Sequence, residues 1–529
     1  FRRAILGNPD VLGSNGWYQM LQNDFWGTPL TDSGSHGSYR PLCVASFKIN
    51  YLLDGFKPLG YHLVNVLLHC MATALVVRLA RHILPSRYGV AIAGLLFAAH
   101  PIHTEAVAGV VGRADLTACV FYLLALLAYI RHIHWRQCCD LRHWLALGLT
   151  ILLAAAAVLC KETAVTALVV CAIYDIIKGY AGSRDKFTNH LTIFHFSASF
   201  QLRFRSVGIL ALALGSIMHT RLSLPQPTVL FSTADNPTAK IGSRWTRFLT
   251  FAYLPVFNFR LLLYPDVLSF DWGMDAIPRI STLFDGKNVL SAAFYGGLAV
   301  ALWINVQTLL RQSVPNVNSS FSRKLASKLV MARSNGGPEE QQRIDDSCRY
   351  CKHEFGMHHS NQCRAMHNNN MSSLSYDDAT AKFNSSAAIL ISTSLLILPF
   401  LPATNVLFYV GFVVAERILY LPSVGYCLLI GLGVSKLIDG KPQPSRKRQI
   451  ILGCFGALLL VYSGKTLLRN LDWQDEESLF RSAISVNPPK ALGNLGSVLS
   501  AQGRHQEAKE ALKAALSYRP NMADVHYNL

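Results

Sequence analysis

Hydrophobic residues occur along this chain in long, nearly unbroken runs rather than on one face of an alternating pattern. Two examples are YGVAIAGLLFAA, which ends at Ala99, and LTACVFYLLALLAYI, which begins at Leu116. A helix that crosses the hydrocarbon of a bilayer needs about 20 such residues, and somewhat fewer inside a bundle. Membrane-spanning helices are therefore predicted at residues 61–84, 88–100, 114–131, 143–160, 164–178, 206–219, 289–310, 386–401, 424–438 and 450–467.

Two further apolar segments are interrupted by polar residues or proline. Residues 247–265 and 404–415 contain Pro, Asn and Arg between their hydrophobic residues, and we interpret them as re-entrant or interfacial pieces. Backbone groups without a partner are costly in lipid, so the spanning segments must be helical. The predicted fold is all-α, a polytopic membrane helical bundle.

The composition agrees with a membrane protein. Hydrophobic residues make up 51% of the 529 positions, and mean hydropathy is +0.27. Only 15% of the residues are charged, against about 25% in an average soluble domain. Most of the twelve cysteines lie inside apolar runs and are expected to be small buried hydrophobes without a disulfide framework. The opening FRRAILGNPD has no apolar region typical of a cleavable signal peptide, so we expect an internal targeting helix or an earlier natural start.

The positive charge indicates orientation rather than nucleic-acid binding. The formal net charge is +18, and the basic residues cluster in short segments between apolar runs, such as RLARHILPSR and KPQPSRKR. Loops rich in Lys and Arg stay in the cytosol. Cytosolic segments are therefore predicted at 79–87, 131–142, 178–205, 311–385 and 439–449. The opposite side then receives 1–60, 100–115, 160–163, 219–288, 401–423 and the chain after about residue 468.

A polar insert divides the predicted bundle at residues 311–385, and its low content of large apolar residues predicts disorder. Within it, Cys348, Cys351, Cys363 and His367 resemble a zinc site. A solvated, His-rich linker is the alternative, because only 11 residues separate Cys351 from Cys363. Glycosylation sequons lie at Asn318, Asn370 and Asn384, and they matter only if the predicted topology is inverted.

The C-terminal part, from Leu479, changes to a soluble helical pattern. The pair Asn494-Leu495 recurs as Asn528-Leu529, a period of 34 residues, with Gly503 and Pro520 at the turns. This is the pattern of tetratricopeptide repeats, of which about three are needed for stability. We therefore expect the natural protein to continue, and DWQDEESLFRSAISVNP to be a preceding degenerate repeat.

Ionisable residues concentrate in the loops assigned to the non-cytosolic side. The densest string is HPIHTEAVAGVVGRAD, from His100 to Asp115, and others are CKET, STADNP, LSFDWGMDAIP and AERILYLPS. Charges this close to lipid are costly unless they pair or line a polar cavity, so they mark a candidate functional site. Carboxylates there are suited to take a proton from a hydroxyl, and Arg and Lys to hold a phosphate.

A purely structural interpretation of these residues stays open. The charged residues could cap helix ends and pair with one another, and the histidines could be hydrogen-bonding anchors rather than metal ligands. The sequence contains no HExxH, P-loop, GxGxxG or paired CxxC motif that would support a metalloprotease or a nucleotidase.

Taken together and in this order, several strings resemble the transmembrane and tetratricopeptide-repeat O-mannosyltransferases of the endoplasmic reticulum. The matching strings are NPDV, NDFWG, SYRPL, HPIHTEAVAGVVGRADL, CKET, STADNP, FDWGMDAIP, FLPATN, AERILYLPS, DWQDEESLF and the terminal repeat. They cover nearly the whole chain apart from the insert. VNPPKALGNLGSVLS and RPNMADVHYNL look closest to the second vertebrate member.

The resemblance implies a C-type glycosyltransferase (GT-C) fold followed by a luminal α-solenoid of tetratricopeptide repeats. It implies a multi-pass enzyme of the endoplasmic reticulum membrane that transfers mannose from dolichyl phosphate mannose to Ser or Thr of cadherin-type domains, which the repeats would bind. The implied organisation is a first luminal loop at 1–60, the bundle at 61–310 and 386–468, the cytosolic insert at 311–385, and the repeats from 469 to 529. The resemblance does not decide whether a divalent metal takes part.

The family pattern places paired acids and a first helix ahead of AI-x-x-NPDV, where this sequence has only Phe1, Arg2 and Arg3. Asp24 is therefore the candidate acid of the first loop, with Glu105 as a second catalytic carboxylate. The residues expected to hold the donor phosphate and sugar are Arg40, His100, His103, Arg113, Asp115, Lys161, Glu162 and Arg417.

Two other classes of function remain as alternatives. A non-catalytic membrane scaffold would bind partners through its repeats and would never consume a lipid-linked sugar. A transporter would need broken helices that converge at mid-membrane, whereas the polar residues here gather at one face.

Overall fold

The computed structural model describes residues 2–137, 141–181, 192–225, 232, 234–313, 383–439 and 445–529. These ranges are helical and contain no strand beyond an isolated bridge between Asn23 and Pro29. Within them, nine helical segments are long and apolar enough to cross a membrane, or ten when one bent pair is included. The predicted all-helical membrane bundle is confirmed at this level.

The helices of the bundle are α4 (Pro58–Ile83), α5 (Arg87–Ala99), α6 (Thr104–Ala108), α7 (Arg113–Gln137), α8 (Arg142–Cys160), α9 (Ala167–Ala181), α10 (Thr192–Ser223), α11 (Arg244–Leu263), α12 (Gly286–Ser313), α16 (Ser385–Ile397), α17 (Pro422–Asp439) and α18 (Ser445–Asp472). Each predicted span coincides with one of the candidate membrane segments. The span predicted at 88–100 is the first half of the bent pair, which turns by 46° where α5 ends. Residues 247–265 fall in α11, which continues through Pro255, and most of 404–415 has irregular backbone.

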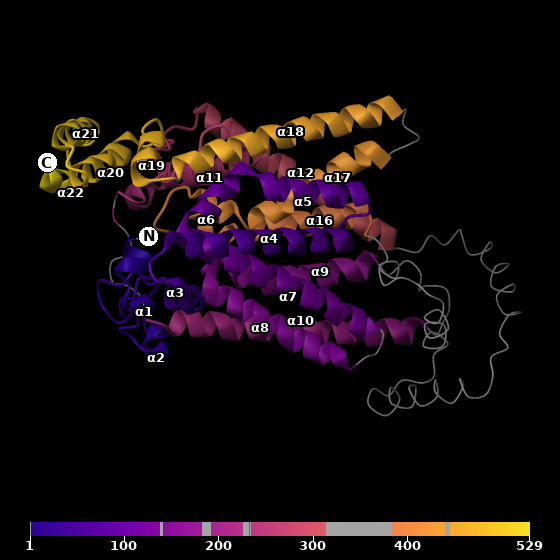
Figure 1. Ribbon diagram of the computed structural model, residues 1–529. Coiled ribbons are helices and arrows are strands. Elements are labelled where there is room, and N and C mark those ends of the chain that lie inside the picture. The colour runs from indigo at the N-terminus through magenta and orange to yellow at the C-terminus, as the bar shows by residue number, and fades with distance from the viewer. Residues whose placement is uncertain are drawn as a thin grey trace, which may run out of the picture.

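Smaller helices cover one end of this bundle. They are α1 (Pro9–Leu12), α2 (Trp17–Met20) and α3 (Pro41–Asp54) from the N-terminal side, and α19 (Glu476–Ser482), α20 (Pro488–Ala501), α21 (His505–Tyr518) and α22 (Ala523–Asn528) from the C-terminal side. Figure 1 shows both groups at the same end of the long helices. We call this the capped end, and we call residues 476–528 the C-terminal segment.

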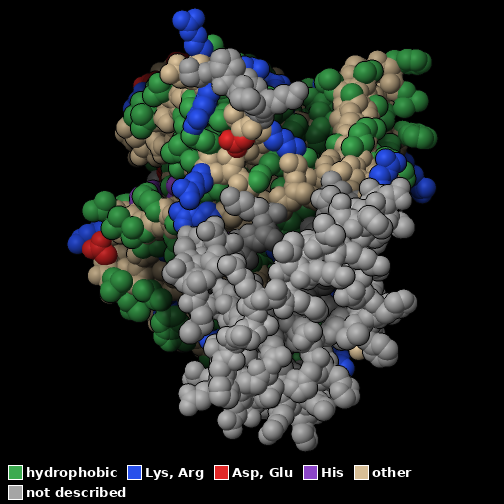
Figure 2. Space-filling model, turned by 90° about the vertical axis from the view of Figure 1, so that its right-hand side faces the viewer, with side chains coloured by type: hydrophobic (Ala, Val, Ile, Leu, Met, Phe, Trp, Pro, Cys, Tyr) green, Lys and Arg blue, Asp and Glu red, His purple; other side chains and the backbone are tan. Residues whose placement is uncertain are grey.

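Basic side chains gather at the opposite end, which faces the viewer in Figure 2. Arg78, Arg131, Lys178 and Lys436 all lie near the ends of helices that point away from the capped end. In the described part of that view, few acidic side chains accompany them. This asymmetry is the one that the positive-inside rule uses to predict a cytosolic face.

Close helix contacts and a gradient of burial organise the bundle. Gly89 of α5 and Gly431 of α17 approach so closely that a Cβ on either would press against the backbone of the other. Small residues allow such contacts between membrane helices, where there is little hydrophobic driving force. The apolar stretch of α7 is 78% buried and central, whereas that of α12 is only 6% buried. The exposed apolar sides of α12 and α18 are therefore suited to face lipid.

Candidate functional site

The charged residues predicted from HPIHTEAVAGVVGRAD converge at the capped end because the chain breaks there. Helix α5 ends at Ala99, and Pro101 cannot continue its hydrogen bonding. The imidazole of His100 caps the next turn by accepting from the amide of Ile102 (3.2 Å). The short turns that follow expose Glu105 to other loops, and α7 then begins with Asp115 in its first turn, where a carboxylate is favourable.

Two ion pairs form the centre of this region. Arg417 donates to the Glu105 carboxylate from its backbone amide (2.8 Å) and from its guanidinium (3.2 Å). Lys161 pairs with Asp115, and both side chains are buried. The charges of these four residues lie close enough to act on one another. The structure thus brings together residues from three separated parts of the chain.

A third pair extends the region toward solvent. Arg40 directs Nε and Nη2 at one carboxylate oxygen of Glu162, at 3.1 and 3.0 Å. Burial alone would lower the pKa of Arg40, but the adjacent Glu162 carboxylate outweighs it and raises that pKa. Arg221, at the end of α10, lies 3.9 Å from the same carboxylate. The sequence analysis did not single out Arg221. Its only distinguishing feature in the sequence is its position at the end of an apolar run.

Glu416 is the second residue that sequence reasoning missed. It is fully buried, and its Oε1 accepts from the amide of Ser269 (2.5 Å) and from the indole Nε1 of Trp272 (3.1 Å). Its Oε2 has no hydrogen-bond partner. Burial, followed by the nearby charge of Glu105, raises the pKa of Glu416 to about 8. Its neighbour Arg417 was singled out in the same string, but the glutamate was not.

The protonation of Glu416 sets the charge balance of the region. Three paired carboxylates face four cations in this region. The carboxylates are Glu105, Asp115 and Glu162, and the cations are Arg40, Lys161, Arg221 and Arg417. A Glu416 carboxyl with a pKa near 8 is mostly neutral at neutral pH. We call these eight residues the charged cluster. It then carries one positive charge in excess, which favours an anionic ligand.

Asp24 lies in the first loop with its carboxylate fully engaged. Oδ1 accepts from the amides of Trp26 (2.9 Å) and Thr28 (3.0 Å), and Oδ2 accepts from the Ser35 hydroxyl (3.0 Å) and the His36 amide (2.8 Å). The side chain is 2% exposed. This geometry makes Asp24 the residue that holds the loop in shape, and its predicted catalytic role stays a prediction.

Arg113 is also committed to local structure. Its guanidinium donates to Asn65 (2.9 Å), to Asn50 (2.5 Å) and to the carbonyl of Tyr61 (2.8 Å), and it lies over the ring of Phe47. The side chain is completely buried. It therefore ties α7 to α3 and α4, and its hydrogen-bond partners all lie outside the charged cluster.

The two predicted histidines occupy anchoring positions. His100 Nε2 lies 3.0 Å from the carbonyl oxygen of Leu262, and His103 Nε2 lies 2.8 Å from the Ser423 hydroxyl. The ring of His103 also packs against Tyr420, with centroids 4.6 Å apart. These contacts fit the alternative in which the histidines are hydrogen-bonding anchors.

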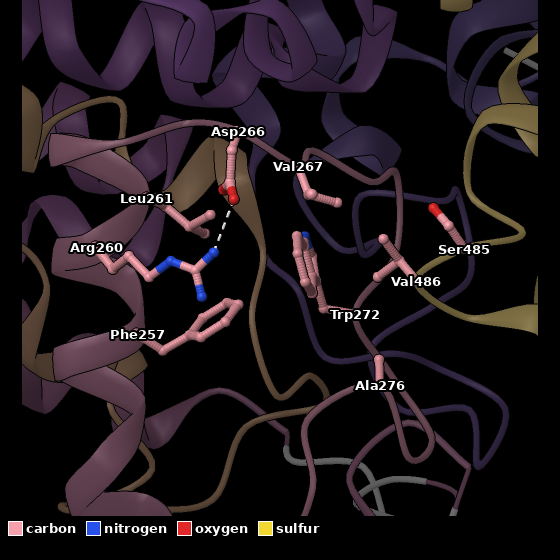
Figure 3. A pocket seen from close by; sticks show the side chains of 9 residues that line it. All are labelled: Phe257, Arg260, Leu261, Asp266, Val267, Trp272, Ala276, Ser485 and Val486. Carbon is pink, nitrogen blue, oxygen red and sulfur yellow. Dashed lines mark hydrogen bonds and ion pairs between the residues drawn. The ribbon is translucent and has the colours of Figure 1, made fainter. Parts of the chain in front are cut away.

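A small cavity lies beside Trp272 (Figure 3). Its volume is about 200 Å³, and it is lined from α11 by Phe257, Arg260 and Leu261, from the following loop by Asp266, Val267, Trp272 and Ala276, and from the C-terminal segment by Ser485 and Val486. Arg260 and Asp266 form an ion pair across one wall (2.9 Å). Drug-sized ligands occupy sites of roughly 300–1,000 Å³, so this cavity is suited to a small polar group rather than a lipid.

Other predicted features fall wholly or partly outside what the structure describes. Cys348, Cys351, Cys363 and His367 lie outside the described residues, as do Asn318 and Asn370. Asn384 is described, and it caps α16 by accepting from the Ala387 amide (2.8 Å). In the described ranges no group of three or more His, Cys, Asp or Glu side chains has the arrangement of a metal site.

Comparisons with known proteins give one family. Residues 223–299, which include α11 and Trp272, match the family model described as "Protein O-mannosyl-transferase TMTC, DUF1736". Protein O-mannosyl-transferase Tmtc1 of Drosophila melanogaster is 52% identical, covering 100% of this chain and 60% of the relative. Tmtc2 of the same organism is 49% identical over 100% of this chain and 62% of the relative. TMTC2 of Mus musculus is 42% identical over 99% of this chain and 60% of the relative. The chain thus spans about three fifths of these relatives, and no solved structure gives a significant match.

Proposed function

The chain belongs to the protein O-mannosyl-transferase TMTC family, and from that premise we propose that it transfers mannose from dolichyl phosphate mannose to Ser or Thr hydroxyls of cadherin-type protein domains. The observation that carries the proposal is the charged cluster at the capped end. It combines partly exposed arginines with buried carboxylates beside apolar helices. A lipid-linked phosphate needs this combination of cations and an adjoining lipid phase.

The proposed chemistry is a single displacement. The acceptor hydroxyl attacks C1 of the mannosyl group, a carboxylate takes the hydroxyl proton, and dolichyl phosphate leaves. Arg40 and Arg417 are the cations best placed for the phosphate, because they combine charge with access to solvent. Glu105 is the proposed proton acceptor. Asp24 and Arg113 are left out of the proposed chemistry, since their polar groups are engaged elsewhere.

We extend the proposal to the organisation of the protein. The bundle would be of the GT-C type in the endoplasmic reticulum membrane, with the capped end in the lumen and the basic end in the cytosol. Helices α20, α21 and α22 would begin a tetratricopeptide-repeat solenoid that binds acceptor proteins. Residues 1–60 would be the first luminal loop, 311–385 a cytosolic insert, and 469–529 the start of the repeats. The basic side chains at one end and the helix pair α20–α21 at the other support this assignment.

The test uses the full-length protein, purified in lipid, with a lipid-linked mannose as donor and a purified cadherin-type domain as acceptor. Transfer is measured as the increase in the intact mass of the acceptor domain. We expect transfer, and about a hundredfold loss of kcat/KM in Arg417→Met, which removes a group that stabilises charge on the phosphate. Arg279→Met is the control, since Arg279 forms an exposed pair with Asp275. A wild-type protein that binds the acceptor domain but leaves the lipid-linked mannose unconsumed would support a scaffold instead.

A further inference from the structure

Six consecutive residues, 269–274, lie between Glu416 and the C-terminal segment. They belong to the loop after α11. Some of them contact Glu416, and the others contact the C-terminal segment. We call them the coupling loop. Among the described residues, both hydrogen bonds to the Glu416 carboxyl come from this loop.

One side of the coupling loop faces the charged cluster. The amide of Ser269 and the indole of Trp272 both donate to the same oxygen of Glu416. Trp272 is 5% exposed and also forms a wall of the cavity in Figure 3. The position of this indole therefore fixes both the orientation of Glu416 and the shape of the cavity.

The other side faces the C-terminal segment. Asp271 pairs with Lys490 of α20 (2.7 Å) and accepts from the Asn487 side chain (3.3 Å). Asn487 also donates to the carbonyl of Gly273 (3.2 Å). Phe270 contacts Phe480 of α19, with ring centroids 5.1 Å apart.

The end of the loop is inserted among the helices of the C-terminal segment. The Met274 side chain belongs to one buried apolar group that includes Leu512, Met522 and Val525. Met274 has a φ of 52°, a left-handed conformation that is rare for residues other than glycine. Strain of this kind persists only where the surroundings impose it, so the packing of Met274 against the C-terminal segment is a constraint on the loop.

Hydrogen bonds within the coupling loop connect its two sides. Asp271 Oδ1 accepts from the amide of Gly273 (2.7 Å), and the Ser269 hydroxyl donates to the carbonyl of Asp271 (3.0 Å). These short-range bonds connect the residues that touch Glu416 to those that touch Lys490. These bonds give a displacement of Asp271 a route to Ser269 and, through the adjoining backbone, to Trp272.

We propose that Lys490 and Asn487 are positioning residues, which act through the coupling loop to hold Ser269 and Trp272 against Glu416. The C-terminal segment then controls the Glu416 carboxyl of the charged cluster, as well as contributing to the neighbouring cavity. This inference rests on the proposed function only for its effect on turnover.

The proposal predicts the direction in which the pKa of Glu416 shifts when the coupling loop is disturbed. Hydrogen bonds from Ser269 and Trp272 stabilise the charged form of Glu416 and lower its pKa. The other charged groups that face Glu416 are Glu105, which raises the pKa, and Arg469, which lowers it. Loss of the two donors while the carboxyl stays buried leaves the effects of burial and of Glu105 in place, so the pKa of Glu416 rises further.

The experiment compares Lys490→Met with Lys490→Arg and with Lys509→Met, a matched control at an exposed lysine of α21. In full-length protein we expect Lys490→Met to lower kcat about tenfold, to move the alkaline limb of the pH–rate profile to higher pH, and to leave the acceptor KM unchanged. Lys490→Arg keeps the charge and should restore most of the activity. An increase in acceptor KM with kcat and the limb unchanged would overturn the proposal, because Lys490 would then only help to hold the acceptor.

Hydrogen exchange supplies a readout that does not need turnover. In Lys490→Met, peptides covering 269–274 and 413–419 should both exchange faster than in the wild type and in Lys509→Met. Faster exchange in the coupling loop alone would show that Glu416 is held independently, and the inference would fall. Trp272→Phe gives a second variant, which should move the limb in the same direction. If the wild type transfers no mannose, the proposed function fails while the exchange data still decide the inference.

Discussion

Replacing Glu416 with glutamine should remove a pH dependence from the stability of this protein. Glutamine keeps the size of the side chain, and its amide oxygen can still accept from Ser269 and Trp272. Its NH₂ group takes the place of the Oε2 atom that has no partner. The change therefore deletes the ionisation and preserves the packing.

The magnitude follows from proton linkage. A carboxyl in an unfolded chain has a pKa of about 4.3, whereas that of Glu416 in the folded protein is about 8. Between these values the folded state binds more protons than the unfolded state, so the free energy of unfolding falls as pH rises. The contribution of Glu416 to the free energy of unfolding is complete when the pH is below the pKa of the unfolded state. It is lost as the pH rises through the pKa of the folded state. The slope is about 1.4 kcal/mol per pH unit, which amounts to about 2 kcal/mol between about pH 6 and pH 8.

The assay is thermal unfolding of purified protein in detergent across this pH range, at one scan rate. For a chain of this length, a loss of about 2 kcal/mol corresponds to roughly 2 °C in Tm. The wild-type Tm should fall relative to that of Glu416→Gln as pH rises. Glu477→Gln is the control, because hydrogen bonding to Arg481 lowers the pKa of Glu477 and keeps it ionised throughout the range. Parallel curves for wild type and Glu416→Gln would refute a raised pKa at this position.

Three further changes have expected outcomes. Gly112→Ala should reduce folded yield strongly because its Cβ would meet the backbone of the preceding short helix, whereas Gly148→Ala, with open space at its Cβ, should leave yield unchanged in size-exclusion chromatography. Arg136→Met leaves the buried carboxylate of Asp175 without its main partner and should lower the free energy of unfolding by about 3–5 kcal/mol in denaturant titrations. Arg40→Lys keeps the charge but loses the planar fork, and it should raise the KM for the lipid-linked donor about tenfold in initial-rate assays.

The bundle could be predicted from the sequence because its signal is local. A run such as 114–131 is apolar on every side, and that alone predicts a helix in lipid. The structure places α7 there and buries most of it. The helix predicted at 88–100 ends at Ala99 in the structure, one residue before its predicted end, and the nearby Pro101 accounts for the break. Each of these features depends on residues that are neighbours in the chain.

The candidate site was harder to predict because its chemistry depends on distant partners. Arg113 looked available, but its donors are taken by Asn50 and Asn65, 63 and 48 residues earlier. Glu416 looked like an ordinary polar residue in AERILYLPS, and only the folded chain, which packs the loop of Ser269 and Trp272 against it, makes it a buried acid. No periodicity or spacing reports which polar groups a folded chain brings together.

Exposure separates the members of the charged cluster that can meet a ligand from those that hold the fold. Lys161 and Asp115 are each 8% exposed at the side chain and neutralise one another, so a phosphate would have to break a sealed pair to reach the lysine. Breaking a buried pair is far more costly than breaking one in contact with water. Arg417 is 41% exposed and Arg40 is 21% exposed, although their partners are also carboxylates. Under the proposed function, a phosphate would therefore compete for these guanidinium groups and for that of Arg221, which is 22% exposed, and the pairs with Glu105 and Glu162 would be the resting state of the site. On this argument the effect of Arg40→Lys falls on donor binding, whereas loss of Lys161 would unfold the capped end before it altered the chemistry.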